Sequence, residues 1–259
     1  MLIIGEKLSI IAKRVREAML SRDKGPIQEI AKRQFNHGAG MIDANIGPAE
    51  GQEDLMPWMV ETIQEVVPAP ICLDTTNCDA LERGLKVHNN QWGKPLINST
   101  SNDPERFPIM ELAAKYGCDV IALTVGKGGL PADAEERCGI AAELMALAGS
   151  FGVPMENIYL DPLVLQIATT QDQALKVVKT IKMFQELNDP PMKTVVGLSN
   201  ISNGCPKNIR PIINNHFLTL LLYEGLTAAI GDAHEIVTTV KTVDAILNKT
   251  LYAHSYLEM

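Results

Sequence analysis

The sequence predicts a single-domain (β/α)8 barrel, also called a TIM barrel, over residues 1–259. Eight short apolar runs alternate with helix-like segments along the whole chain. Continuous apolar runs are typical of parallel strands that are buried on both faces. The length of 259 residues suits this fold as one domain, and no Pro-, Gly- or Ser-rich linker divides the chain.

The predicted strands share a β-favouring apolar core and a polar carboxyl end. In chain order, with their polar ends, they cover residues 2–5, 41–48, 71–77, 95–100, 120–124, 158–162, 194–200 and 228–232. A doubly wound open sheet would show the same alternation and is the alternative architecture. No Gly-x-Gly-x-x-Gly follows the first strand, which argues against a dinucleotide-binding version of that sheet.

The predicted helices fill the intervals between the strands and end at helix-stop residues. Gly38, Gly117 and Gly152 follow three of them, and Pro68 follows a fourth. In chain order the helices cover residues 11–20, 27–36, 55–67, 79–89, 104–116, 132–151, 171–187, 209–225 and 234–247.

Composition and charge exclude several classes of function. The formal net charge is −8 and no basic run occurs, so a nucleic-acid partner has little support. The sequence contains no run of about 18 apolar residues, so no membrane span is expected. It also begins without a positively charged leader before a long apolar segment, so no signal peptide is expected. The five cysteines are scattered without a Cys-x-x-Cys pair, which indicates reduced thiols in a cytoplasmic protein rather than a zinc site.

Polar side chains stand at the carboxyl ends of the predicted strands, which converge on one mouth in a barrel. These residues are Glu6, Asp43, Asn45, Asp74, Asn77, Asn98, Thr124, Asp161, Ser199, Asn200 and Asp232. A ring of carboxylates and amides suits a flat heterocycle rich in N–H donors, such as a pterin. The scarcity of cations and the absence of His at these ends argue against a phosphate-rich substrate and against a bound metal.

Each of these residues also has a purely structural interpretation. An Asp or Asn after a strand often caps the next helix, and this interpretation is favoured for Asp43, Asn77 and Asp232 taken singly. Asp74, Asn98 and Asp161 differ because each directly ends an apolar run, where an unpaired polar side chain destabilises the fold.

At these positions the sequence resembles the pterin-binding methyltransferases, the methyltetrahydrofolate:corrinoid protein methyltransferases of acetogenic and demethylating anaerobes. The resemblance implies a barrel, usually a homodimer, that binds tetrahydrofolate or 5-methyltetrahydrofolate in its mouth. It further implies methyl transfer between N5 of the folate and the cobalt of a corrinoid on a separate protein. The segments that carry it are Gly5-Glu6-Lys7, Asp43–Pro48, Asp74–Asn77, Ile97–Thr100, Tyr159–Leu163, Gly197–Asn200 and Asn208–Pro211.

The resemblance assigns roles by motif. Asp74, Asn98 and Asp161 would hydrogen-bond the pterin ring, while Gly197 and Ser199 would shape the floor and wall of the site. Asn200 would lie near N5 as the catalytic residue, where its hydrogen bond strengthens as charge develops. Five further residues are candidates for supporting the pterin contacts or for contacting the folate tail or the partner: Glu6, Asp43, Asn45, Lys127 and Arg210.

Some segments depart from the family pattern. Asp232-Ala233-His234 begins like the corrinoid signature Asp-x-His-x-x-Gly, but Val237 stands where Gly is required, so cobalamin is expected on the partner protein. The Gly-rich loop 124–129 and the Glu6-Lys7 pair, where Glu-Arg is more usual, would alter folate-tail or partner contacts. Both directions of transfer occur among such enzymes: demethylation systems methylate tetrahydrofolate, and acetogenesis runs the opposite way.

Two alternatives accompany this prediction. A dihydropteroate synthase-like enzyme shares the fold and the pterin site, but its first-loop and eighth-strand motifs do not occur at residues 5–8 and 231–234. A non-catalytic folate-binding protein would keep the pocket without transfer activity, and the presence of Asn200 argues against it. A Schiff-base aldolase using Lys7 or Lys127 has less support than either.

Overall fold

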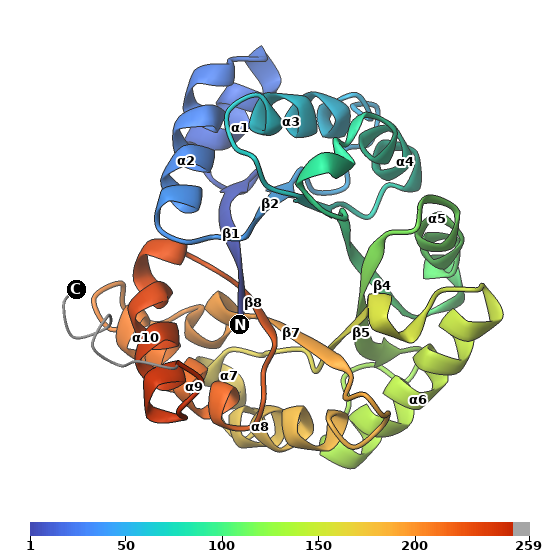
Figure 1. The fold of residues 1–259 in the computed structure, drawn as a ribbon, viewed down its shortest axis with the longest axis vertical. Helices are drawn as coiled ribbons and strands as arrows, with labels where there is room; N and C mark the ends of the chain where they lie inside the picture. Colours follow the sequence, from blue (N-terminus) through green and yellow to red (C-terminus); the bar gives the residue numbers. More distant parts are fainter. Residues whose placement is uncertain (251–259) are drawn as a thin grey trace.

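The computed structural model describes residues 1–250 as a closed barrel of eight parallel strands with helices around it (Figure 1). The strands follow one another around the barrel in sequence order, and β1 pairs with β8. The predicted (β/α)8 barrel is confirmed, and the open-sheet alternative is wrong because this last pairing closes the sheet. The predicted domain also includes residues 251–259, which lie outside the described residues, so its boundaries stay a prediction.

The strands differ from the predicted ones mainly at their ends. They are β1 (Leu2–Ser9), β2 (Met41–Asn45), β3 (Ile71–Asp74), β4 (Leu96–Asn102), β5 (Asp119–Gly126), β6 (Ile158–Asp161), β7 (Lys193–Gly197) and β8 (Ala228–Gly231). The first strand continues past Gly5, with a register shift against β2 between Gly5 and Leu8. The seventh ends at Gly197, and the 3-10 helix η4 (Leu198–Ser202) follows, so Ser199 and Asn200 lie beyond the strand.

The helices cover the outside of the barrel (Figure 1). They are α1 (Lys13–Ser21), α2 (Lys24–Asn36), α3 (Leu55–Gln64), α4 (Cys78–Val87), α5 (Pro108–Tyr116), α6 (Ala134–Ser150), α7 (Ile167–Thr170), α8 (Gln173–Phe184), α9 (Arg210–Tyr223) and α10 (Ala233–Ile246). The single helix predicted over 104–116 is instead a 3-10 turn, Pro104–Arg106, followed by α5. Pro108 begins α5 because proline fits the first helical turn, where its missing N–H costs no hydrogen bond.

The barrel interior contains one apolar side chain from each strand. These side chains are buried and form one cluster inside the barrel, which consists of Ile4, Met41, Cys72, Leu96, Ile121, Tyr159, Val195 and Ala228. Because side chains alternate between the two faces of a strand, the residue two positions later points into the barrel again. The apolar cluster therefore forms the floor on which the next layer of side chains lies.

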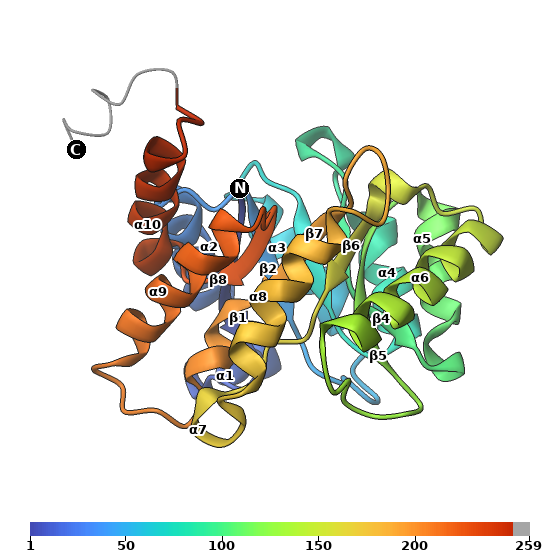
Figure 2. The same cartoon turned by 90° about the horizontal axis from the view of Figure 1, so that it is seen from below.

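The second core lies between the barrel and the helices and contains most of the buried aliphatic residues. In Figure 2 the amino terminus lies on the upper side of the barrel, while α1, α7 and the loop before α9 lie on the lower side. The carboxyl ends of the strands face that lower side, which is the barrel mouth. None of the helices within residues 1–250 has the length and apolar composition that crossing a membrane requires.

Candidate functional site

The layer above the apolar floor consists of the residues two positions further along each strand. In strand order these are Glu6, Asp43, Asp74, Asn98, Leu123, Asp161, Gly197 and Ile230. All eight line one cavity at the barrel mouth, with a volume of about 710 Å³. The period of two therefore places this set of side chains in a single cup.

The cavity brings together most of the residues that the sequence analysis singled out. Asp74, Asn98, Asp161, Gly197 and Asn200 line it, although they come from four strands and from η4. Strand register explains part of this convergence, since Asp74 pairs with Asn45 of β2 on one side and with Asn98 of β4 on the other. The supporting candidates that also line the cavity are Glu6, Asp43, Asn45 and Arg210.

The cavity is acidic on the side formed by β2 and β3. The Asn45 amide donates a hydrogen bond to the Asp74 carboxylate. Burial raises the pKa of Asp74 to about 6 despite this bond. Burial, and next the neighbouring Asp74 carboxylate, raise the pKa of Asp43 well above its ordinary value. Oδ1 of Asp43 is buried and accepts no hydrogen bond from residues 1–250, so this side of the cup has more acceptor oxygens than the Asn45 amide satisfies.

Asp161 ends β6 on another side of the same cavity. Its carboxylate accepts a hydrogen bond of 2.7 Å from the backbone N–H of Leu163. Burial nevertheless raises the pKa of Asp161 to about 7. The fully buried Arg137 of α6 supports this end of β6, since its Nε donates to the Pro162 carbonyl at 2.7 Å. Asp161 is thus a buried acceptor held on a rigid segment.

Gly197 and Asn200 form the edge of the cup after β7. A Cβ atom placed on Gly197 would lie 3.0 Å from Nδ2 of Asn200, so glycine leaves the space that the amide uses. Asn200 is exposed at the mouth, and its Oδ1 accepts from Nδ2 of Asn203 at 3.4 Å. The Asn200 amide therefore lies at the cavity lining, where a bound molecule can contact it.

Ser199 does not line the mouth cavity. Its hydroxyl donates to Oε1 of Glu6 at 2.5 Å, and it lines a neighbouring cavity. Ser199 therefore ties η4 to β1, and its contact with the pterin stays a prediction. Burial raises the pKa of Glu6, and the hydrogen bond from Ser199 opposes that rise.

Lys127 also lies away from the mouth cavity. It is exposed in the Gly-rich loop after β5 and lines a separate hollow that includes Glu136 and Glu143 of α6. Thr124 is turned out of the cup as well, since its hydroxyl donates to the Asp161 carbonyl at 3.0 Å. The polar residue of β5 that the sequence pointed to is thus replaced in the cup by Leu123.

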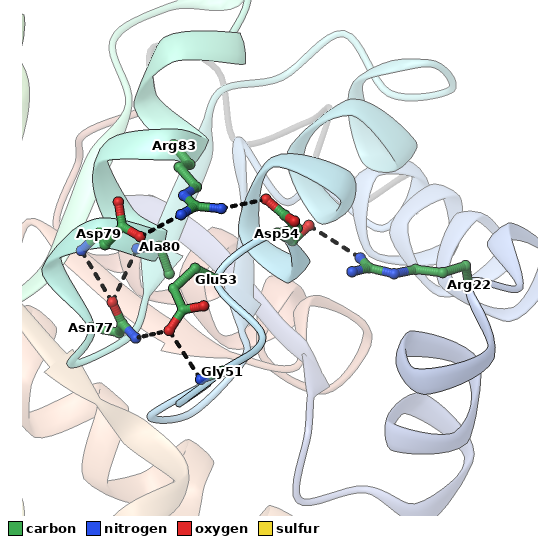
Figure 3. Close-up of polar contacts among 8 residues, drawn as sticks. All are labelled: Arg22, Gly51, Glu53, Asp54, Asn77, Asp79, Ala80 and Arg83. Carbon is green, nitrogen blue, oxygen red and sulfur yellow. Dashed lines mark hydrogen bonds and ion pairs between the residues drawn. The ribbon is translucent and has the colours of Figure 1, made fainter.

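Asn77 and Asp232 act as helix caps, as favoured from the sequence. Figure 3 shows the Asn77 side chain accepting from the N–H groups of Asp79 and Ala80 at the start of α4, while its amide donates to Glu53. Asp232 accepts from the N–H of His234 at the start of α10. The same structural interpretation is wrong for Asp43, because no helix begins after it and its side chain lines the cavity.

The apolar part of the cavity lining was not predicted from the sequence. Leu123 and Ile230 come from the strand layer, and Leu163 and Val164 come from the segment after β6. Counting two residues on from the inward apolar residue of β5 and β8 would have found the first pair. Ser9, Ser99 and Asn203 complete the missed polar lining. Within residues 1–250 no three His, Cys, Asp or Glu side chains are grouped to hold a metal ion.

Several proteins of known activity resemble the chain over most of its length. It is 27% identical to the methylcorrinoid:tetrahydrofolate methyltransferase of Eubacterium limosum over 263 aligned positions, which cover 99% of the chain and 94% of that protein. It is 34% identical to the methionine synthase of Mycobacterium leprae over 91% of the chain, a match that spans 20% of that longer protein. Both relatives are methyltransferases, the class of enzyme predicted from the sequence.

Solved structures support the fold. A structure of Yersinia pestis DHPS with a pterine-sulfa conjugate superposes with a TM-score of 0.70 at 17% identity, covering 95% of the chain and 94% of the other protein. The sequence pattern described as "Pterin binding enzyme" matches residues 13–231. Most of the barrel falls within that range, as do all the strand residues that line the cavity except those of β1. The chain therefore belongs to the pterin binding enzyme family.

Proposed function

We propose that this protein is a methyltransferase that moves a methyl group between N5 of tetrahydrofolate and the cobalt of a corrinoid carried by a separate protein. The single observation that supports this most is the convergence of Asp74, Asn98, Asp161 and Asn200 on one cavity of about 710 Å³. The methyltransferase relatives, one of which acts on a methylcorrinoid and tetrahydrofolate by its name, supply the reaction class.

The chemistry of the cavity fits a reduced pterin. The ring has N–H donors along one edge, and the carboxylates of Asp74 and Asp161 in the cavity lining can accept hydrogen bonds from them. The Asn98 amide, which also lines the cavity, can both donate and accept. Leu123, Leu163 and Ile230 line the apolar part of the cavity, where the faces of a flat ring gain from burial. The buried Oδ1 of Asp43, which lacks a hydrogen bond within residues 1–250, adds acceptor capacity behind the ring.

Asn200 is the residue proposed to act at N5. When the methyl group leaves N5, the electron pair of the C–N bond stays on the nitrogen, which takes up a proton from water. A hydrogen bond that strengthens as this charge develops lowers the barrier, and a carboxamide supplies it without ionising. Gly197 contributes by leaving space for the Asn200 amide, and the Glu6–Ser199 hydrogen bond holds η4 in place.

The corrinoid is proposed to arrive on a partner protein at the open mouth. The cobalt supplies the nucleophile or the methyl group, according to the direction of transfer. Ile11 and Asn203, both exposed, are among the residues that line the mouth cavity. The match to the methionine synthase of Mycobacterium leprae spans only 20% of that longer protein. Transfer to a corrinoid protein added as a separate chain is therefore the experiment that tests a separate partner.

The dihydropteroate synthase-like alternative is less consistent with the end of β8. Such an enzyme must stabilise a diphosphate leaving group, which needs cations and free N–H donors there. Here the position holds Asp232, whose carboxylate is 4% exposed and accepts from Gln34 at 2.8 Å. Its nearest cation, Lys7, lies 3.3 Å from Asp232 and is already paired.

The experiment that tests the proposed function follows methyl transfer between free methylcobalamin and tetrahydrofolate through the corrinoid absorption spectrum. We expect Asn200→Ala to lower turnover by about 100-fold, the scale seen when one donor to a developing charge is removed. Folate affinity should change much less. Unchanged turnover in Asn200→Ala would remove the role assigned to this residue, and no transfer by the wild type would remove the proposed function.

Asn77→Ala is the matched control. Asn77 also follows a strand end, but its side chain caps α4 instead of facing the cavity. We expect this variant to transfer methyl groups like the wild type at temperatures well below its unfolding midpoint. A loss equal to that of Asn200→Ala would show that the assay reports stability rather than chemistry.

A further inference from the structure

The buried Arg137 of α6 connects three separate segments of the barrel. Its side chain is fully buried and does not line the mouth cavity. Its Nε donates to the Pro162 carbonyl at 2.7 Å, Nη1 to the Asp133 carbonyl at 3.0 Å and Nη2 to Oε1 of Gln173 at 2.9 Å. The guanidinium therefore joins the segment after β6 to α6 and α8, which are neighbours on the outside of the barrel (Figure 1).

Arg137 is also a buried cation that forms no ion pair within residues 1–250. Burial lowers its pKa, and the charges of Asp133 and Glu136 only partly oppose this. A buried charge without an ion pair opposes folding, and a neutral side chain of similar shape would avoid that cost. Stability alone therefore does not explain an arginine at this position.

The Pro162–Leu163 peptide group is held at both of its polar atoms. Its carbonyl accepts from Arg137, and its N–H donates to Oδ1 of Asp161 at 2.7 Å. The carbonyl and the N–H of this trans peptide point in opposite directions, so the bond to Arg137 keeps the N–H aimed at the Asp161 carboxylate. The preceding carbonyl, that of Asp161, is held by the Thr124 hydroxyl at 3.0 Å.

Leu163 has a backbone conformation that a leucine adopts only under constraint. Its φ is +63°, in the left-handed region where every residue except glycine is strained. A residue in this conformation persists only where its surroundings over-determine it. Leu163 lines the mouth cavity together with Asp161, so the strain falls at the site itself.

We propose that Arg137 is a positioning residue for pterin binding, because it holds the peptide before Leu163 in the orientation that serves both Asp161 and the Leu163 side chain. The N–H of that peptide orients the Asp161 carboxylate, and the Leu163 side chain packs against the bound ring. This inference rests on the proposed function, because it assumes that the pterin occupies the cup. Arg137 thereby fixes one polar and one apolar contact before the ligand arrives, which removes an ordering cost from binding.

The size of the effect follows from the strain at Leu163. When Arg137 is replaced, the ligand-free protein can relax from the left-handed conformation, and binding must then restore it. The cost of one strained residue corresponds to about 5- to 150-fold in affinity.

The same replacement changes how binding depends on pH. Burial raises the pKa of Asp161 to about 7, and the hydrogen bond from the Leu163 N–H opposes that rise. Losing this bond raises the pKa further, because it favours the ionised form. Since folate binding requires ionised Asp161, the affinity of the variant should begin to fall at a higher pH than that of the wild type.

The experiment is calorimetric titration of the whole protein with 5-methyltetrahydrofolate between pH 5.5 and 8.5. Arg137→Lys keeps the positive charge but lacks the planar fork of donors. We expect it to weaken binding at pH 8 by the factor given above and to raise the pH midpoint of binding by at least about 0.5 unit. A merely structural role would not move this midpoint.

The change of midpoint reports Asp161, because Arg137 contacts none of the other ionisable groups in the cavity lining. Those groups are Glu6, Lys7, Asp43, Asp74 and Arg210.

Leu163→Gly supplies the second comparison, because glycine adopts the left-handed conformation without strain. This variant loses the apolar contact with the ring, so its own affinity should be lower than that of the wild type. Adding Arg137→Lys to it should then cost no more than about threefold, against the larger loss in the wild-type background. Equal losses in the two backgrounds would overturn the inference.

Phe184→Leu is the control for lost stability. Phe184 is fully buried at the last position of α8 and does not line the mouth cavity. The variant should unfold more easily because it leaves a cavity in the core, yet keep the wild-type affinity and midpoint. A midpoint raised as far as in Arg137→Lys would overturn the inference.

Gln173→Ala takes the place of Arg137→Lys if that variant does not fold. It removes one acceptor of the guanidinium and should weaken binding about threefold, with the midpoint again raised. Wild-type affinity and a wild-type midpoint in whichever variant folds would overturn the inference. Failure of the wild type to bind the folate would instead refute the proposed function itself.

Discussion

Asp161→Asn is the substitution for which the structure gives the sharpest expectation. The Asp161 carboxyl is 6% exposed, and the hydrogen bond from Leu163 N–H does not compensate its burial. Burial raises its pKa to about 7 from an ordinary value of 3.8. At pH 8 the folded protein without ligand therefore carries a buried charge that destabilises it, and an amide of the same shape removes that charge.

The magnitude follows from linkage between protonation and folding. A difference of about three pKa units at about 1.4 kcal/mol per unit corresponds to about 4 kcal/mol at pH 8. Since the folded-state pKa lies above the unfolded value, the wild type loses this stability as pH rises from about 4 to about 7. We therefore expect Asp161→Asn to raise the free energy of unfolding by about 2–4 kcal/mol at pH 8 and by less than about 2 kcal/mol at pH 5.

The assay is urea unfolding of the ligand-free protein at both pH values. Asp232→Asn serves as the control, because Asp232 is equally buried but has partners. Burial alone would raise its pKa, yet the hydrogen bond from Gln34 and the charge of Lys7 outweigh burial and lower it. Asp232→Asn should therefore destabilise the protein at pH 8. The reasoning is refuted if Asp161→Asn is destabilising at pH 8, or if its gain does not depend on pH.

The same carboxyl should control folate binding in the opposite sense. If ionised Asp161 accepts hydrogen bonds from the pterin, binding requires loss of its proton below pH 7. The affinity of the wild type should then fall about tenfold per pH unit between pH 6.5 and 5.5, measured by titration. Asp161→Asn should bind folate weakly, with less dependence on pH. An affinity of the wild type that is flat over this range would contradict the assigned role.

Three further predictions concern packing and positioning. Asn77→Ala should lower the free energy of unfolding by about 1 kcal/mol through loss of the α4 cap, with folate affinity unchanged; a tenfold loss of affinity would contradict this. Gly84→Ala should destabilise by about 1–3 kcal/mol, because its Cβ would lie 2.4 Å from Cγ of Met56, and this outweighs the gain of about 1 kcal/mol from replacing a helical glycine; stabilisation in urea unfolding would refute it. Gly197→Ala should lower turnover by about 10- to 100-fold by displacing the Asn200 amide, and steady-state kinetics equal to those of the wild type would show that the amide can move aside at no cost.

Much of the fold could be predicted from the sequence, because strands buried on both faces are continuous apolar runs and the helices between them carry clear stop signals. The element boundaries were less accurate. The sequence predicts a strand that reaches Asn200, whereas β7 ends at Gly197, since residue propensity does not show where a strand passes into a 3-10 turn. The extension of β1 to Ser9 was missed because its pairing with β2 is irregular.

The alternation of strands and helices and the concentration of Asp and Asn at strand ends can be predicted from the amino-acid sequence alone. Which member of each neighbouring pair enters the cup was decided by barrel closure, which sets the face of every strand at once. Leu123 lies inside and Thr124 outside for this reason. Ser199 lies in η4, beyond the last residue of β7, and bonds Glu6 instead of lining the cup. A polar residue shows where a strand ends, but only the register of all eight strands decides what it touches.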